Sequence, residues 1–530
     1  MTSRLDRIWQ AMAARPLLAS ALLGAISACG FPPLRLWPVG LAALALFITL
    51  LRKANCWKHA TLMGWLFGLA HLTVANNWIA TAFTYQAEMP QFLGWLAVPL
   101  LCLYLAVYPA LAAITANRLG RNAGTFTFSA IFAAAWIITE WLRSWVFTGY
   151  PWPPLGLMLL GDFDSPGIPL LLPWLGTYAL SGLAILIAAG FAALVQQGRR
   201  IGQLVLALLV IGAMTFPFGS LTQAEGSIRY ALVQPLIPQA EREDPGKFED
   251  QFIRIAQLTM PGSDSERLVL WPEAAIPDYL ENGYPQRYYS ARTTGADPDF
   301  ARQRIGVLIG QQSMLLTGLV HLDIGQLEGR TTAVSARNSV SAIDGRGEIV
   351  GDYAKAHLVP YGEYLPMREI LEPIGLSRLV AGSIDYLPGP GPRTFNLGRF
   401  GMAGIQICYE IVFSGQVVDR SNRPDYIFNP SNDGWFGSWG PPQHVAQARL
   451  RAIEEGLPVL RSTTTGISAV IDANGVVRQH VPTGVTGRLD GLIPPAKAPT
   501  LFARLGNWLP LGWALLILAA SLVAMRRRRV

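Results

Sequence analysis

The stretch GIQICYEIVF, residues 404–413, raises the first question about the fold. Apolar residues precede and follow Cys408, as they do in a strand that enters a hydrophobic core. Glu410 stands two positions further along the chain. Cys408 is therefore either a small apolar residue in a core strand or a nucleophile beside a carboxylate, and its sequence neighbours leave both interpretations open.

The residues around this stretch predict a mixed α/β domain. Asp-Gly in DGRG (344–347) and Asn-Gly in DANG (472–475) are typical of type I′ hairpin turns. The segment 443–456, QHVAQARLRAIEEG, has the spacing of an amphipathic helix closed by a glycine. A domain of about 270 residues is large enough to bury its own core. Strands are expected at 229–235, 267–273, 305–311, 313–322, 338–344, 401–408, 424–433 and 467–477.

The first 218 residues differ in composition from this domain. The whole chain is 51% hydrophobic and 15% charged, with a mean hydropathy of +0.31. Soluble proteins carry about 25% charged residues. The deficit lies in the N-terminal part, where Glu88 is the only charged side chain between Ala60 and Asn117. We therefore expect a membrane part and a globular part that meet near residue 218.

Eight apolar stretches are candidates for helices that cross a bilayer. Basic residues precede the first stretch and follow every second one, and the positive-inside rule places such residues in the cytoplasm. The stretches are 16–31, 36–51, 59–82, 92–115, 123–147, 170–196, 201–218 and 507–525. The basic residues are Arg4, Arg7, Arg15, Arg52, Lys53, Lys58, Arg118, Arg121, Arg199, Arg200 and Arg526–Arg529. The pattern predicts eight spans, with both termini in the cytoplasm.

Three segments follow from this topology: a bundle of seven spans (1–218), an extracytoplasmic domain (219–506), and an eighth span with a basic tail (507–530). A cleaved leader ending at Cys29 is the alternative for the first span, but further apolar spans follow at once and favour a bundle. The net charge of +7 comes from short loops and the tail, which argues against nucleic-acid binding.

Two charged residues fall inside a predicted span. Glu140 and Arg143 lie three positions apart in the fifth stretch, so they share one helix face and are expected to pair. A place near the outer interface is the ordinary interpretation of such a pair, whereas a functional role is the alternative.

Polar groups at the ends of predicted strands form a candidate catalytic set. Glu273 ends LVLWPE, Lys355 lies in GDYAKAHLVPYGEYLP, and Cys408 ends GMAGIQIC. Each residue alone is more often a solvated loop residue or a core residue. Together they supply a thiol nucleophile, a carboxylate that accepts its proton, and a cation for an oxyanion. The spacing of His and Cys marks no metal or cofactor site, so neither is expected.

Five longer motifs occur along the chain: TEWLRSWVFTGYPWPPLG (139–156), LVLWPEAAIP, KAHLVPYGEYLP, GIQICYEIVF and NPSNDGWFGSWGPPQHVAQARLRAIEEGLPVLRSTTTG. Together they resemble the apolipoprotein N-acyltransferase family, the last enzyme of bacterial lipoprotein maturation. The resemblance covers nearly the whole chain and implies a multi-pass α-helical membrane bundle joined to an α/β nitrilase-like αββα sandwich, the carbon–nitrogen hydrolase domain.

The same resemblance implies roles for individual residues. Cys408 would be the nucleophile, Glu273 the general base and Lys355 the oxyanion stabiliser. We expect Lys355 to favour the thiolate, because a neighbouring cation lowers a thiol pKa. Supporting roles would fall to Glu363, Tyr409 and Glu410.

The implied reaction moves an acyl chain in two steps. A membrane phospholipid would acylate Cys408, and the thioester would then acylate the N-terminal amine of a diacylglyceryl-cysteine apolipoprotein. The implied setting is the bacterial inner membrane, with a monomeric enzyme, a periplasmic catalytic domain and no cofactor.

Two rival functions use the same features differently. A membrane-tethered amidase or nitrilase would use the same three residues with water as acceptor, but it would not need access to a bilayer. A membrane scaffold or transporter would bury Cys408 as an unreactive strand residue.

The sequence leaves the role of two segments of the globular part undecided. Many relatives have a tryptophan where this chain has Glu243, so a gating role for that aromatic is in doubt here. The apolar segment 364–382 is either a lid that reaches the membrane or an ordinary packing segment.

Overall fold

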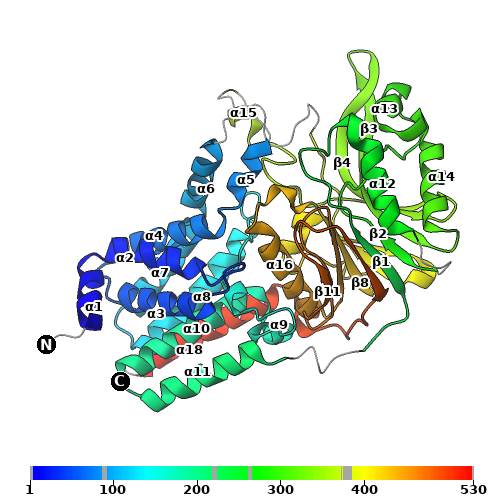
Figure 1. The fold of residues 1–530 in the computed structure, drawn as a ribbon. Coiled ribbons are helices and arrows are strands. Elements are labelled where there is room, and N and C mark those ends of the chain that lie inside the picture. Colours follow the sequence, from blue (N-terminus) through cyan, green and yellow to red (C-terminus); the bar gives the residue numbers. More distant parts are fainter. Residues whose placement is uncertain are drawn as a thin grey trace. The chain divides into compact units, whose positions relative to one another are not determined.

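The computed structural model describes residues 4–85, 92–217, 224–260, 266–371, 373 and 385–527 (Figure 1). The chain forms two compact units. A helical unit comprises Met1–Ala80, Gln91–Phe218 and Thr500–Val530, and an α/β unit comprises Thr81–Pro90 and Gly219–Pro499.

Apolar helices make up the first unit. Within the described residues, four are long and apolar enough to cross a membrane: Phe92–Gly120, Thr125–Arg143, Thr177–Gln196 and Trp508–Arg527. Three other predicted spans form shorter apolar helices, α2, α3 and α11. The helices are α1 (Arg4–Ala14), α2 (Pro16–Ala28), α3 (Trp37–Arg52), α4 (Trp57–Ala75), α5 (Ile79–Ala82), α6 (Phe92–Leu105), α7 (Val107–Gly120), α8 (Thr125–Arg143), α9 (Leu172–Leu175), α10 (Thr177–Gln196), α11 (Arg200–Thr215), α17 (Leu501–Leu505) and α18 (Trp508–Arg527).

Glu140 and Arg143 pair as predicted, but they are buried inside the protein. Their side chains are each 4% exposed, with Arg143 Nη2 3.6 Å from Glu140 Oε1. The same oxygen accepts a hydrogen bond from the Leu155 backbone N–H at 2.8 Å. Arg143 donates to the carbonyl oxygens of Trp152 and Pro153. The pair therefore fixes the segment after α8 rather than facing water.

The α/β unit contains two six-stranded sheets. Their strand orders are β12-β1-β2-β3-β4-β5 and β11-β10-β9-β8-β7-β6. The strands are β1 (Arg229–Gln234), β2 (Leu268–Leu270), β3 (Met314–Leu327), β4 (Arg330–Asp344), β5 (Ile349–Ala354), β6 (Arg393–Asn396), β7 (Met402–Ile405), β8 (Tyr426–Ser431), β9 (Val459–Thr463), β10 (Ser468–Ile471), β11 (Val477–Val481) and β12 (Gly487–Leu492).

Both sheets have the same pairing pattern. Three parallel strands, β1-β2-β3 or β7-β8-β9, continue on one side into two antiparallel strands. One antiparallel strand pairs with the other edge of the three, namely β12 with β1 in the first sheet and β6 with β7 in the second. Residues that follow parallel strands gather at the carboxyl edge of a sheet, where α/β proteins place their sites.

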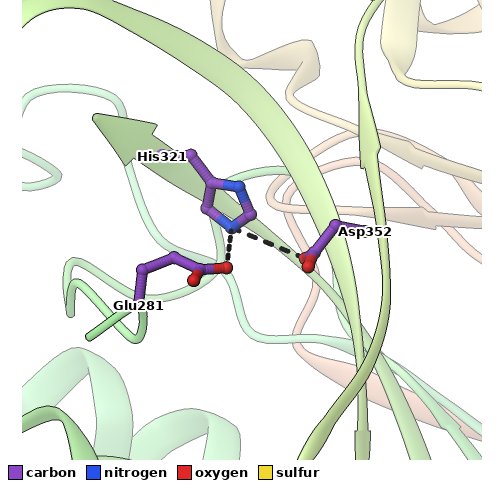
Figure 2. Close-up of side chains that lie close together, drawn as sticks. All are labelled: Glu281, His321 and Asp352. Carbon is purple, nitrogen blue, oxygen red and sulfur yellow. Dashed lines mark ion pairs between the residues drawn. The ribbon is translucent and has the colours of Figure 1, made fainter. Parts of the chain in front are cut away.

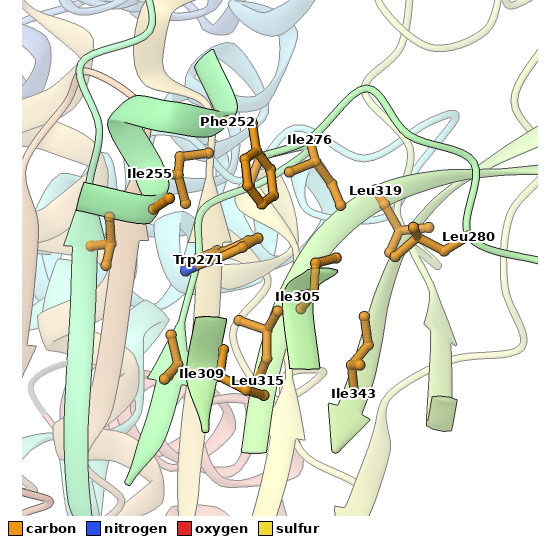
Figure 3. Packing of buried hydrophobic residues seen from close by; sticks show 14 of the residues in the cluster. Phe252, Ile255, Trp271, Ile276, Leu280, Ile305, Ile309, Leu315, Leu319 and Ile343 are labelled. Carbon is orange, nitrogen blue, oxygen red and sulfur yellow. The ribbon is translucent and has the colours of Figure 1, made fainter. Parts of the chain in front are cut away.

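Helices α12 (Phe248–Thr259) and α14 (Pro298–Ile309) pack on the first sheet through a hydrophobic core (Figure 3). Phe252 on α12 lies edge-on to Trp271, with ring centroids 6.4 Å apart. Ile305 and Ile309 on α14 enter the same core. The remaining helices of the unit are α13 (Gln286–Arg292), α15 (Arg368–Leu371) and α16 (Gly440–Glu455).

The prediction of a strand at 305–311 is wrong. These residues form the end of helix α14, which stops at Ile309, and the turn that follows it. Asp297 caps this helix by accepting hydrogen bonds from the N–H groups of Asp299 and Phe300, and Pro298 occupies the first turn. A short apolar run fits a buried helix as well as a strand, and the cap decided between them.

The predicted helix at 443–456 is confirmed as α16, which begins at Gly440 and ends before Gly456 in the left-handed conformation (φ 67°). Its polar side chains are buried, contrary to the amphipathic pattern. Arg451 and Glu454 are fully buried and pair at 3.1 Å. Pairing is what allows such charges to stay inside a protein.

Both predicted hairpin turns are present, but they are not of type I′. Only Gly347 (φ 85°) and Gly475 (φ 76°) have positive φ in these turns. In each hairpin the strand register shifts by one residue next to the turn. This combination is typical of a type I turn followed by a glycine bulge, which needs one left-handed residue rather than two.

Candidate active site

Glu273, Lys355 and Cys408 follow three different strands, β2, β5 and β7, yet their side chains meet. Lys355 Nζ lies 3.6 Å from Glu273 Oε1, and the Cys408 thiol is close enough to both charged groups for each of them to change its pKa. All three residues are buried, with exposed fractions of 6%, 1% and 4%. The structure thus brings together the three residues that the sequence singled out.

Gly318 on β3 allows the backbone at Glu273 to approach the sheet. A Cβ atom at Gly318 would lie 2.6 Å from Glu273 Cα and 2.5 Å from Ala274 N. Gly318 N–H donates to Pro272 O at 3.2 Å, and its carbonyl accepts from Ala275 N–H at 2.9 Å. Only a residue without a side chain fits this approach, so Gly318 sets the position of Glu273.

A hydrogen-bond network holds two carboxylates around Lys355. The Asn338 side-chain amide donates to Glu273 Oε1 and to Glu363 Oε1, each at 2.7 Å. Glu273 Oε2 accepts from the Asn432 backbone N–H at 2.7 Å. Lys355 Nζ donates to Glu363 Oε1 at 3.0 Å. Sequence reasoning missed Asn338, although an asparagine in the middle of a buried strand was a usable signal.

The network determines the charge states of the site. Burial of Glu273 acts to raise its pKa, but Lys355 and the amide of Asn338 outweigh it and lower the pKa. Burial acts to lower the pKa of Lys355, but Glu363 and Glu273 outweigh it and raise the pKa. The carboxylate and the ammonium are therefore both charged at neutral pH.

The charge of Lys355 acts on the Cys408 thiol in the expected direction, but two other effects outweigh it. Burial and the Glu273 carboxylate raise the pKa of Cys408 well above its ordinary value, against the lowering effect of Lys355. The site at rest holds a neutral thiol beside an ionised carboxylate, so the thiol has to lose its proton as it reacts.

Cys408 lies in a tight turn rather than at the end of a strand. Strand β7 ends at Ile405, and Cys408 opens the 3₁₀ turn Cys408–Val412 with φ +50°. Side chains other than glycine rarely adopt this left-handed conformation, and it persists only where the surroundings hold it. Here the Cys408 carbonyl oxygen accepts hydrogen bonds from His444 Nε2 at 3.1 Å and Asn429 Nδ2 at 3.4 Å.

A fully buried ionic network lies behind this turn. His444 Nδ1 is 2.9 Å from both Asp433 Oδ1 and Arg461 Nη2, and Arg461 contacts both oxygens of Asp433 at 2.8 Å. A carbonyl oxygen only accepts, so His444 Nε2 carries a proton where it meets Cys408 O. These residues were not predicted, although an arginine within the apolar strand β9 and an aspartate directly after β8 were signals.

The sequence is similar over nearly its whole length to known proteins. The apolipoprotein N-acyltransferase N-terminal domain matches residues 23–190, and the carbon–nitrogen hydrolase domain matches residues 231–493. The apolipoprotein N-acyltransferase of Rhodopseudomonas palustris is 34% identical over 96% of this chain and 94% of its own length. That of Vibrio cholerae is 31% identical over 97% and 98%. The chain belongs to the apolipoprotein N-acyltransferase family.

The carbon–nitrogen hydrolase match of this family member contains every residue of the candidate site. Its sheets give the domain a nitrilase-like fold. An amidase from Nesterenkonia sp. of known structure is similar to this part, at 17% identity and a TM-score of 0.32, over 52% of this chain and 93% of that chain.

Glu410, a supporting residue by resemblance to the family, connects the two halves of the site. Its Oε2 accepts from the Ile407 N–H, and its Oε1 accepts from the Tyr353 hydroxyl and the Ala356 N–H, each at 2.7 Å. Burial raises the pKa of Glu410 to about 7 against these hydrogen bonds. Glu410 thus ties the turn at Cys408 to the segment that follows β5.

Three further expectations concern neighbouring residues. Tyr409 is buried, and its ring packs edge-on against Phe413 with centroids 5.1 Å apart. Glu243, which replaces the tryptophan of many relatives, is exposed and pairs with Arg292 at 2.5 Å. Most of the candidate lid at 364–382 lies outside the described residues.

Proposed function

We propose that this apolipoprotein N-acyltransferase family member transfers an acyl chain from a membrane phospholipid to the N-terminal amine of a diacylglyceryl-cysteine apolipoprotein. Family membership makes the chain an acyltransferase. The observation that carries the chemical assignment is the burial of Cys408 together with Glu273, a carboxylate 3.6 Å from the Lys355 ammonium.

In the first half-reaction, Glu273 takes the Cys408 proton while the sulfur attacks the ester carbonyl of the phospholipid. Lys355 stabilises the negative charge that develops on the carbonyl oxygen. The C–O ester bond then breaks, and Glu273 returns the proton to the departing lysophospholipid oxygen. The acyl chain stays on Cys408 as a thioester.

In the second half-reaction, Glu273 accepts a proton from the substrate amine while its nitrogen attacks the thioester. The C–S bond breaks, and Glu273 returns this proton to the sulfur. The products are an amide and the free thiol, and the amide is the more stable of the two acyl compounds. Because the first product leaves before the second substrate reacts, the kinetics are ping-pong.

The charge states support this use of Glu273 and Lys355. A neutral thiol needs a base at the moment of attack, and the ionised Glu273 is near enough to raise the pKa of the thiol. Lys355 keeps its charge because Glu363 and Glu273 flank it. Asn338 bridges the two carboxylates, so the base and the cation are oriented before any substrate binds.

The proposal includes the topology expected from the sequence. Seven spans lie within residues 1–218, and the eighth lies within residues 507–530. Both termini are cytoplasmic. Residues 219–506 lie in the periplasm, next to the inner membrane. The four membrane-length helices and three shorter apolar helices support the bundle, and the basic loops support its orientation. The working unit is proposed to be a monomer.

Mass spectrometry of the purified full-length enzyme, incubated with phospholipid vesicles alone, tests the assignment. We expect one acyl group on the peptide that contains Cys408, released by neutral hydroxylamine as a thioester is. Cys408→Ala should carry none, whereas the matched control Cys56→Ala, at an exposed cysteine of the helical unit, should be acylated normally. An adduct that persists in Cys408→Ala would overturn the proposal.

A second measurement separates acyl transfer from hydrolysis. A diacylglyceryl-cysteine peptide with a free amine is added to the acylated enzyme, and the amide product and free fatty acid are quantified. We expect the amide to dominate. Fatty acid release that is unaffected by the peptide would favour the amidase alternative.

A further inference from the structure

A second group of reactive side chains lies outside the active site. Glu281, His321 and Asp352 come from the segment after β2, from β3 and from β5, and their side chains converge (Figure 2). His321 is two residues beyond Leu319 on β3, so it shares the face that packs under α12 and α14. Gly318, one residue before Leu319 and so on the other face of β3, faces Glu273. The group therefore occupies the opposite face of the first sheet from the active site.

The distances within the group fit a shared ion better than hydrogen bonds. His321 Nε2 lies 3.7 Å from Glu281 Oε1 and 3.6 Å from Asp352 Oδ1. The three candidate ligand atoms lie within 4.8 Å of one another. Hydrogen bonds are shorter than this, whereas two ligands at about 2.1 Å from a tetrahedral zinc ion lie about 3.4 Å apart. We propose that Glu281, His321 and Asp352 bind a Zn²⁺ ion.

The charges in this region favour a cation. Within the described residues, neither Glu281 nor Asp352 forms an ion pair with a lysine or arginine. Arg337 lies directly opposite His321 on β4, but its guanidinium pairs with Asp323 at 3.1 Å. Two carboxylates that share one imidazole are therefore left with excess negative charge, which a divalent ion would neutralise.

The surroundings support the ligands. The Ser341 hydroxyl donates a hydrogen bond to Asp352 Oδ1, an outer contact of the kind that orients a metal-binding carboxylate. The single proton of this hydroxyl goes to Asp352, so Ser341 Oγ accepts a hydrogen bond from His321 Nε2–H at 3.2 Å, and a bound Zn²⁺ would replace that proton. The side chains of His321, Glu281 and Asp352 are 15%, 35% and 39% exposed, so an ion has access from solvent.

The ligand set determines the choice of metal. An imidazole nitrogen with two carboxylates suits Zn²⁺, whereas Ca²⁺ and Mg²⁺ prefer sites made of oxygen alone. Three protein ligands leave one position for water. Bound Zn²⁺ would fasten the segment after β2, which also carries Glu273, to β3 and β5.

Zinc binding to the full-length enzyme in detergent tests the proposal. Competition with a chromogenic chelator should show one Zn²⁺ per chain, and His321→Ala and Asp352→Asn should each weaken binding by about 100-fold, since even outer-shell losses cost about 10–100-fold. Glu348→Gln, at an exposed acid just before β5 and outside the group, is the matched control and should bind normally. Cys408→Ala should also bind zinc normally, and this result would exclude the Cys408 thiol as a zinc ligand.

X-ray absorption at the zinc edge gives an independent result, with nitrogen and oxygen ligands and no sulfur expected. Zn²⁺ should also raise the unfolding midpoint of the wild-type protein but not of Asp352→Asn, because an ion that binds only the folded state stabilises it. Wild-type affinity in His321→Ala, or sulfur in the absorption spectrum, would overturn the proposal. If His321→Ala does not fold, Asp352→Asn decides the matter alone.

Discussion

The two sheets of the α/β unit share one pairing pattern but contribute different parts of the active site. The first sheet supplies the charged residues, Glu273 after β2 and Lys355 after β5, held by Asn338 and Glu363. The second sheet supplies Cys408, held through its own carbonyl oxygen. The first sheet therefore positions side chains that are already ionised. The second sheet positions the backbone turn that holds Cys408.

Because of this difference, we expect substitutions in the two sheets to impair the reaction in different ways. A change in the first sheet alters charge or proton transfer while the thiol stays in place. A change behind the second sheet moves the thiol while the carboxylate and ammonium keep their contacts. Four substitutions test whether the two sheets contribute to the site in these different ways.

The largest effect is expected for Glu273→Gln, which removes the base but keeps a side chain of the same shape. General bases contribute about 10²–10⁴-fold to a rate, so thioester formation in a single turnover should slow by about 10³-fold or more. Rapid quenching and mass spectrometry measure this rate. Glu243→Gln is the control, because Glu243 is exposed and pairs with Arg292. A near-normal rate in Glu273→Gln would contradict the assigned role.

Gly318→Ala tests the close backbone approach in the first sheet. The added Cβ would lie 2.5 Å from Ala274 N, so Glu273 has to shift; we expect about 10²-fold slower acyl transfer and about 1–3 kcal/mol less stability. Gly351→Ala on β5 is the matched control, because its Cβ would meet only the Phe395 ring at 3.6 Å or more. Equal effects of the two changes would show that the contact at Gly318 is not specific.

His444→Leu tests the backbone turn of the second sheet. The Cys408 carbonyl loses a donor, and an unsatisfied buried group costs about 1–3 kcal/mol. We expect kcat to fall by about 10–100-fold at unchanged KM, and alkylation of the thiol to slow. His444→Gln retains an N–H donor and should recover part of the rate. A KM effect without a kcat effect would show that His444 does not act through Cys408.

The smallest effect concerns Glu410, which joins the two halves. Its pKa is about 7 in the folded protein and 4.5 ordinarily, so between these values the folded state binds more protons. The stability that Glu410 contributes is therefore complete below 4.5 and is lost as the pH rises through 7. Unfolding of wild type between pH 4.5 and 8 should show this decline. Glu410→Gln should show a weaker one, since Glu455, also with a pKa of about 7, remains. An unchanged slope would contradict the assignment.

Much of this architecture was predictable because it depends on local pattern. Apolar length and basic loops marked the helical unit, Gly456 marked the end of α16, and strand-ending polar residues marked Glu273, Lys355 and Cys408. The run at 305–311 was mistaken for a strand, because periodicity in a short apolar segment does not distinguish the two structures.

The residues that hold Glu273 and Cys408 in place could be found only from the tertiary structure. Asn338, Asp433, His444 and Arg461 act through partners far away in the chain, and sequence spacing carries no record of such partners. The neutral state of Cys408 likewise depends on burial, which outweighs the charge of Lys355. The group of Glu281, His321 and Asp352 has no spacing signature, because its members come from three segments that only the sheet brings together.

Local chemistry in the sequence thus specified which side chains are candidates for the reaction and which segments are apolar. Tertiary packing decided the rest, namely the left-handed turn at Cys408, the contact that requires Gly318, and the charge of each group. The physical reason is that residue type and periodicity act over a few positions, whereas strain, burial and electrostatic interaction depend on neighbours that only the fold supplies.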